Sequence, residues 1–200
     1  MKRALPLCVL FSALVTGAFG VSAPDEYLAA WERFAKPPGA AELRSWMVCV
    51  MRDIAAGTAC GERLAAAVPP FYGRLGIFVT LMRGGRVRGC FGAFHHASDD
   101  IETVLRHYLR GALRYDPRYR PLDISETADT RIILTIAGPL APAASPDDVD
   151  ISRCGLMLAF DGGETCVFVP AEIKNRDNLK RMIAGKDIQQ CAAFEAVTIR

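Results

Sequence analysis

The sequence predicts one compact α+β domain in which antiparallel β-sheets are flanked by helices. Two pairs of strand-like runs, within 76–94 and 155–169, are each interrupted by adjacent glycines, which indicates hairpins and therefore antiparallel pairing. Helical patterns precede, separate and follow these hairpins instead of alternating with single strands, as α+β folds require. Roughly 180 residues follow the N-terminal segment, enough for one domain with a substantial core.

The N-terminal segment predicts export. Met1, Lys2 and Arg3 are followed by an apolar run to Gly20 and by small residues of the kind an export peptidase accepts. We therefore expect a signal peptide at 1–22, a domain at 23–200, and a periplasmic or secreted protein with no stable membrane span after processing. The alternative is an uncleaved anchor, although the run is short for the about 20 apolar residues that cross a bilayer.

Charge limits the partners that we expect. The chain has 24 basic and 22 acidic side chains, and removal of Lys2 and Arg3 with the signal peptide makes the two numbers equal. A formally neutral domain gives no general attraction to polyanions, so nucleic-acid binding is not expected.

The cysteine pattern leaves two interpretations open. Pairing is favoured in an oxidising compartment, yet the spacing does not choose among the many connectivities, and a domain of this size folds equally well with buried free thiols. Six cysteines follow the N-terminal segment: Cys49, Cys60, Cys90, Cys154, Cys166 and Cys191.

Two helices are predicted before the first hairpin. The segment 24–35 has acidic residues near its start and ends at the Pro-Pro-Gly of 37–39. The segment 40–55 carries apolar side chains at helical spacing and should bury one face. A loop with a short helix then leads to Pro69-Pro70. The apolar positions of the second helix, with its tryptophan in the core, are Leu43, Trp46, Met47, Val50, Met51 and Ile54.

The first hairpin joins 76–82 to 86–94. With Gly84-Gly85 as a two-residue turn, Val79 pairs with Cys90 and Phe78 with Phe91. Alternation then predicts one face shared by four residues of the second strand, unless a one-residue bulge reverses part of the assignment. These four residues are Arg86, Arg88, Cys90 and Gly92.

The later elements follow from the same signals. A strongly amphipathic helix spans 99–115, with a capping box from Asp99 and Glu102, and stops at Asp116-Pro117. A strand at 131–137 and a proline-rich loop at 138–150 precede the second hairpin. A helix at 171–184 and a strand at 194–199 complete the prediction.

Four ordered segments resemble the AMMECR domain family over roughly 40–200, most strongly over 40–170. Residues 76–81 with Val87-Arg88-Gly89-Cys90-Phe91-Gly92 are similar to the family's strand and its following RGC motif, and 116–122 (DPRYRPL) to its D-x-R-F-x-P-L segment. The strand 132–140 and the hairpin of 154–170 agree in order, with Cys154 where many members have a histidine.

The resemblance implies a compact α+β domain with a cleft near the RGC motif. It implies no firmly assigned reaction, but a cysteine, here Cys90, that is suspected to be catalytic. It also implies Memo-type and radical-SAM proteins as partners.

Cys90 is the leading candidate for chemistry. A nucleophilic cysteine needs a lowered pKa and room for substrate, which Arg88 and the flanking Gly89 and Gly92 are suited to provide. His95 or His96 is the candidate base. The alternative interpretations are a buried structural cysteine and two loop histidines.

Two further groups have equally open interpretations. Asp116 and Arg118 either line the cleft as an acid and an anion clamp or form a local pair at the helix end. Arg106, Arg110 and Arg114 recur every four residues, and we interpret them as a solvated face in which Glu102 pairs with Arg106. No C-x-x-C or zinc-like histidine spacing occurs, so neither a metal nor a cofactor is expected.

Two functions therefore remain. One is a thiol-dependent enzyme acting on a small polar or anionic substrate, with catalytic Cys90, His95 and His96 and binding residues Arg88, Gly89, Gly92, Asp116 and Arg118. The other is a non-catalytic module that binds a small molecule or a protein through the same cleft.

Overall fold

The structure, a computed structural model, describes residues 25–200, so the predicted signal peptide lies outside the described residues. Its strands form one antiparallel sheet of order β2-β1-β3-β7-β5-β6, with β4 paired to β7, which confirms the α+β fold. The strands are β1 (Gly76–Arg83), β2 (Arg86–Ala93), β3 (Thr130–Ala137), β4 (Ala141–Pro142), β5 (Cys154–Phe160), β6 (Thr165–Phe168) and β7 (Ile188–Ile199).

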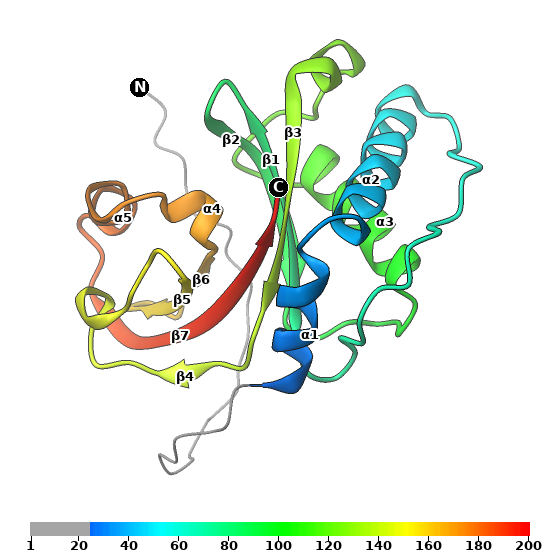
Figure 1. The fold of residues 1–200 in the computed structure, drawn as a ribbon. Helices are drawn as coiled ribbons and strands as arrows, with labels where there is room; N and C mark the ends of the chain where they lie inside the picture. The colour runs from blue at the N-terminus through cyan, green and yellow to red at the C-terminus, as the bar shows by residue number, and fades with distance from the viewer. Residues whose placement is uncertain (1–24) are drawn as a thin grey trace.

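The long curved strand β7 joins two halves of the molecule (Figure 1). Its first part pairs with β5, and its last residues, Ala196 to Ile199, pair with β3. The strand is longer than the predicted 194–199 because its first six residues extend the sheet of the second half, where the sequence shows no clear alternation.

Three helices cover one face of the β1–β3 region, as Figure 1 shows. Their apolar stripes pack on alternate residues of β1 and β3, including Val79 and Leu134, to form the largest core. Trp31 and Trp46 are buried in it, as predicted. The helices are α1 (Glu26–Phe34), α2 (Gly39–Ala56) and α3 (Ile101–Arg114).

Aspartates cap two of these helices. The Asp25 side chain accepts from the backbone N–H of Tyr27 at the start of α1. At α3 the cap is Asp100, which accepts from the N–H of Thr103, so the predicted capping box from Asp99 is wrong by one residue. The N-cap is Asp100, one residue later than predicted, because Asp100 adopts the extended backbone that an N-cap requires.

The opposite face of β1–β3 packs against the second half of the molecule. A smaller core there combines Phe78 and Met82 of β1 with Phe194 of β7 and with Ala171 of a short helix, α4 (Pro170–Ile173). Because both faces are covered, seven of the eight residues of β1 are buried.

The predicted helix at 171–184 is two helices, α4 and α5 (Arg176–Ile183). Lys174 adopts a positive φ of 61°, which ends α4, and the Asn175 side chain accepts from the N–H of Asn178 to begin α5. The apolar pattern continues across the break, so the sequence pattern alone favoured one helix.

The segment between α2 and β1 also differs from the prediction. Among its described residues 58–75 there is no helix, so the expected short helix is wrong. Instead the backbone carbonyl of Glu62 accepts from Trp46 Nε1 at 3.1 Å, which holds the chain along α2 as an extended loop. The structure also adds two 3₁₀ helices, η1 (Ile124–Asp129) and η2 (Pro146–Asp148), to the predicted elements.

Both interpretations of the cysteines apply in part. Cys49 and Cys60 form a disulfide that links α2 to the following loop. Among the other described cysteines, Cys90, Cys154 and Cys191 are free thiols, and Cys166 Sγ donates to Glu164 Oε1 at 3.4 Å. Within residues 25–200, none of the helices combines the length and apolar character needed to cross a bilayer.

Candidate functional site

Cys90 lies on β2, deep between the two halves of the molecule. Its side chain is 1% exposed and packs in the smaller core with Phe78 and Met82. Thr80 Oγ1 lies 3.4 Å from Cys90 Sγ, within hydrogen-bond distance for sulfur. Burial, and then the nearby carboxylate of Glu172, raise the pKa of the Cys90 thiol well above its ordinary value.

The predicted register of the first hairpin is wrong by one residue beyond its turn. Arg83 pairs with Arg86 as expected, but a bulge between Leu81 and Met82 leaves Arg88 unpaired. Cys90 consequently faces Thr80 instead of Val79. The bulge places Cys90 on the same face as Phe78 and Met82, so the predicted face shared with arginines is also wrong.

Arg88 binds a carboxylate away from the thiol. Its guanidinium donates to Glu126 Oε1 and Oε2 at 3.2 and 3.1 Å, and to the carbonyl of Arg120 at 2.8 Å. The Arg88 hydrogen bond lowers the pKa of Glu126 to about 2. Arg88 therefore fastens η1 and the preceding loop to β2. The cation that favours the Cys90 thiolate is Arg118, whose effect is smaller than that of burial.

Asp116 and Arg118 form a buried ion pair, which belongs to a larger cluster. Arg118 Nη2 lies 2.7 Å from Asp116 Oδ2 and 2.9 Å from Glu172 Oε1, and the three side chains are at most 4% exposed. The backbone N–H of Cys90 donates to the same Asp116 oxygen at 2.8 Å. The cluster thus joins the end of α3, strand β2 and helix α4.

Burial and the neighbouring charges act differently on the pKa values of Arg118 and Glu172. Burial lowers the pKa of Arg118, but Glu172 and then Asp116 more than compensate, so the guanidinium stays charged. Burial raises the pKa of Glu172 in spite of Arg118. One cation thus serves two buried carboxyl groups. Glu172 was not among the predicted site residues, because no sequence motif links α4 to the RGC segment.

Thr135 Oγ1 on β3 is a buried oxygen with no hydrogen-bond partner among residues 25–200, whereas Glu172 Oε1 has its ion pair with Arg118. Thr135 pairs with Phe78 and so lies on the same face of the sheet as Cys90. Unsatisfied polar atoms of this kind are rare in protein interiors and occur at sites of strain or function.

The space beside the two glycines of the motif is filled. A Cβ on Gly89 would lie 2.0 Å from the carbonyl oxygen of Ala112 in α3. One on Gly92 would lie 2.2 Å from the carbonyl oxygen of Ile77. The missing side chains of these glycines allow other backbone segments to approach β2 closely. They therefore leave no space for substrate at these atoms.

The histidines lie away from the thiol. His96 Nδ1 is 2.7 Å from the Tyr108 hydroxyl and Nε2 is 2.8 Å from the Leu75 carbonyl, so both of its nitrogens have partners other than Cys90. Burial lowers the pKa of His96. His95 is exposed just beyond β2. Neither residue has a described contact with Cys90.

Two hollows lie on the helical side of the molecule, and neither borders Cys90. The larger, about 510 Å³, is lined by Arg110 and Arg114 of α3 together with Tyr115 and the end of α2. The smaller, about 130 Å³, is lined by Arg106, Arg110 and Cys60 among others. The predicted cleft near the RGC motif is thus not where these hollows form.

The three arginines of the α3 stripe differ in their partners. Arg106 Nη2 lies 3.8 Å from Glu102 Oε2, which confirms the predicted pair, and its guanidinium stacks on Trp46. Arg114 donates to the carbonyls of Ile54 and Ala55 at the end of α2. Arg110 is exposed and has no hydrogen bond or ion pair with any residue of 25–200. It is the uncommitted cation that both hollows share.

Comparison with known proteins agrees with the resemblance to the AMMECR family. The model of the AMMECR1 family matches residues 48–193. A protein from Methanococcoides burtonii is 32% identical over 96 residues, which cover 45% of this chain and 48% of that protein. One from Methanosarcina mazei is 33% identical over 95 residues, covering 45% of this chain and 47% of that protein. The chain thus spans about half the length of the curated relatives it matches.

A solved structure agrees with the fold. The crystal structure of an uncharacterized protein, PH0010, from Pyrococcus horikoshii aligns with a TM-score of 0.57 at 15% identity. The alignment covers 82% of this chain and 93% of that one. At this identity the likeness concerns the fold.

Proposed function

The chain belongs to the AMMECR1 family, and from its own side chains we propose that it is a binding module for a small anionic ligand, in which Cys90 has a structural role. The observation that carries the proposal is the hollow of about 510 Å³ between the ends of α2 and α3, with the uncommitted Arg110 on its wall. Its volume falls in the range of small-molecule sites, about 300–1,000 Å³.

The lining of this hollow suits an anion that also has an apolar part. Arg110 offers its guanidinium donors, and Arg114 adds a second positive charge although its donors cap α2. Tyr115, 65% exposed, Ile54 and Pro121 supply apolar surface beside the charges. An exposed aromatic ring of this kind is typical of a recognition surface.

Binding of simple anions tests the proposal. Pyrophosphate and succinate are titrated into the protein by calorimetry, and the Arg110 side-chain resonance is followed by NMR. Arg110→Gln should weaken binding about tenfold or more, because a hydrogen-bonded ion pair is lost. Arg52→Gln is the matched control, since Arg52 is exposed, has no partner among residues 25–200 and lies outside both hollows. Equal affinity of the two variants, or no binding by the wild type, contradicts the proposal.

A thiol-dependent enzyme is the second candidate, and one observation favours it. Thr135 Oγ1 is buried without a hydrogen-bond partner among residues 25–200, on the side of the sheet that carries Cys90. A small polar substrate between the two halves would satisfy it, with Glu172 as the nearby base. Such an enzyme requires opening of the smaller core, because the Cys90 side chain is buried there. Alkylation of Cys90, described in the Discussion, decides between the two candidates.

A further inference from the structure

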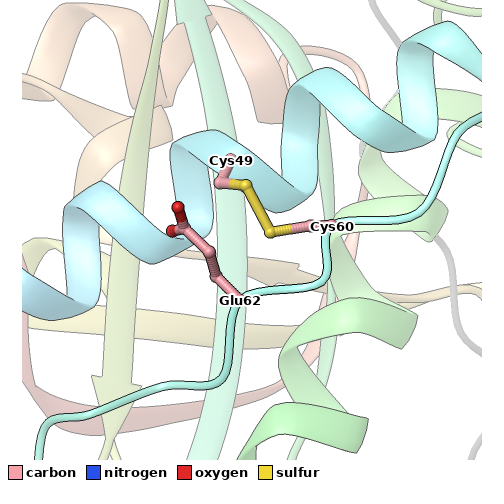
Figure 2. Close-up of side chains that lie close together, drawn as sticks. All are labelled: Cys49, Cys60 and Glu62. Carbon is pink, nitrogen blue, oxygen red and sulfur yellow. A yellow bond between two sulfur atoms is a disulfide. The ribbon is translucent and has the colours of Figure 1, made fainter.

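The side chains of Cys49, Cys60 and Glu62 come together where α2 and the loop that follows it lie side by side (Figure 2). One ligand atom from each lies within 4.8 Å of the others, and the two sulfurs are joined as a disulfide. Cys49 comes from α2, whereas Cys60 and Glu62 come from the loop that follows it. Their spacing in the sequence is irregular, so only the fold reveals the group.

The backbone of Glu62 is held by contacts with both helices. Its backbone carbonyl accepts from Trp46 Nε1 of α2 at 3.1 Å and from Arg106 Nη2 of α3 at 3.2 Å. These two hydrogen bonds hold the loop close to the cysteines while the carboxylate itself stays exposed. The main chain of Glu62 is therefore held beside the cysteines by contacts other than the disulfide, and the exposed carboxylate lies within reach of both sulfurs.

We propose that, once the disulfide is reduced, Cys49, Cys60 and Glu62 bind one thiophilic divalent cation of the zinc class. Two thiolates and one carboxylate are established ligand types for zinc, and three protein ligands leave a fourth position open. Tetrahedral binding at zinc–sulfur distances of about 2.3 Å requires sulfurs about 3.8 Å apart. Cys60 lies in a loop without regular structure, so this separation of the sulfurs requires no shift of a helix or strand.

The surroundings of the group supply the open position and balance its charge. The hollow of about 130 Å³ is lined by Cys60 and holds space for a water molecule as fourth ligand. Two thiolates, one carboxylate and a divalent cation carry one net negative charge. Arg106 and Arg110 on the wall of the same hollow offset it.

The chemistry couples metal binding to redox state. A dithiol reductant transfers two electrons and two protons to the disulfide: the bond between Cys49 Sγ and Cys60 Sγ breaks, and the reductant forms its own disulfide. Binding of the cation then releases the two thiol protons to solvent. A small-molecule disulfide that takes up these two electrons, and two protons from solvent, becomes a dithiol while the bond between Cys49 Sγ and Cys60 Sγ re-forms and the cation is released, so the oxidised protein should hold no metal.

Cobalt is a suitable probe, because its thiolate complexes absorb light. The protein is reduced with a dithiol, freed of excess reductant without oxygen, and titrated with Co²⁺. Circular dichroism before and after the titration shows whether the fold persists. We expect one equivalent to bind with a thiolate-to-cobalt charge-transfer band, which Zn²⁺ abolishes, whereas the oxidised protein gives no band.

Three variants assign the ligands. Cys49→Ser should remove the band, and Glu62→Gln should keep the band but weaken binding about tenfold or more, because one ligand loses its charge. Cys154→Ser is the matched control, since Cys154 is a partly exposed free thiol outside the group. If the reduced chain unfolds, recovery of its circular dichroism on addition of Zn²⁺ supports the proposal, and failure to recover contradicts it. A wild-type band absent or unchanged in Cys49→Ser also overturns it.

Discussion

The Asp116 carboxylate, just after α3, accepts a hydrogen bond at 2.8 Å from the backbone N–H of Cys90 on the edge strand β2. The same oxygen is 2.7 Å from Arg118 Nη2. An edge strand normally leaves such donors open to pairing with other chains. The DPRYRPL segment therefore closes the edge at the RGC motif and ties it to the ion-pair cluster.

Removal of the cation from this cluster should strongly destabilise the fold. Arg118→Ala leaves the carboxyl groups of Asp116 and Glu172 buried without their partner, and such a change costs about 3–5 kcal/mol of unfolding free energy. Urea denaturation measures it. Arg52→Ala, an exposed arginine without partners among residues 25–200, should change the value by less than about 0.5 kcal/mol. Similar losses for the two variants would contradict a stabilising cluster.

Gly89 should tolerate no side chain. Gly89→Ala places a Cβ 2.0 Å from a backbone oxygen of α3, and either the helix or the strand must shift. We expect a loss of about 1–3 kcal/mol or more in urea denaturation, typical of overpacking. Gly61→Ala is the control, because no atom lies within 4 Å of its new Cβ and its φ is not positive. Equal stability of the two variants would mean that β2 and α3 are not in close contact.

Cys90 should react slowly with iodoacetamide. Its burial and raised pKa leave little accessible thiolate at neutral pH, so native protein should be alkylated at Cys90 at least about tenfold more slowly than at the partly exposed Cys154. Mass spectrometry of peptides taken at successive times measures both rates in one sample. In urea the two rates should converge. Fast alkylation of native Cys90 at neutral pH would instead favour the thiol-dependent enzyme.

Glu126 should make part of the stability depend on acid. Its pKa, about 2 in the fold because of Arg88, lies below the ordinary value of 4.5. A lowered carboxyl pKa contributes stability that is full above pH 4.5 and is lost as the pH falls toward 2. Glu126→Gln should therefore be less stable than the wild type at pH 7, with a difference that narrows between pH 4.5 and 2.

Thermal unfolding across this range measures the Glu126 effect. Glu32→Gln, an exposed glutamate with no partner among residues 25–200, is the matched control and should follow the wild type at every pH. A Glu126→Gln difference that stays constant from pH 7 to pH 2 would show that the carboxylate charge is unimportant.

The sequence predicts the elements of this fold better than their tertiary relations. Helix α3 and both hairpins follow from local patterns, since apolar spacing and turn glycines act over a few residues. The register of Cys90 does not follow from local patterns. It depends on the bulge that leaves Arg88 unpaired, and Arg88 donates to the Glu126 carboxylate on η1, 38 residues further along the chain. Glu172 was missed for the same reason: its ion pair with Arg118 joins segments that share no local pattern.

Some features of the candidate site also follow from the sequence, whereas others depend on how distant segments pack. The sequence left two interpretations open for Asp116 and Arg118, and the structure shows a buried ion pair that extends beyond the helix end to Glu172. The interpretation of Gly89 and Gly92 as room for substrate depended on what would fill the space, which only the packing of α3 and β1 decides. The uncommitted Arg110 lies in the basic stripe, but its lack of partners is a property of the fold.

The course of β7 also affects how the chain assembles. The other described strands all precede it, yet it lies between β3 and β5 in the interior of the sheet. During synthesis the two hairpins are able to form as they emerge, but neither half gains its shared neighbour until β7 has left the ribosome. Pairings of such long sequence separation slow the final step. We expect folding to finish only after translation of the domain, with the open edges of β3 and β5 exposed to chaperones until then.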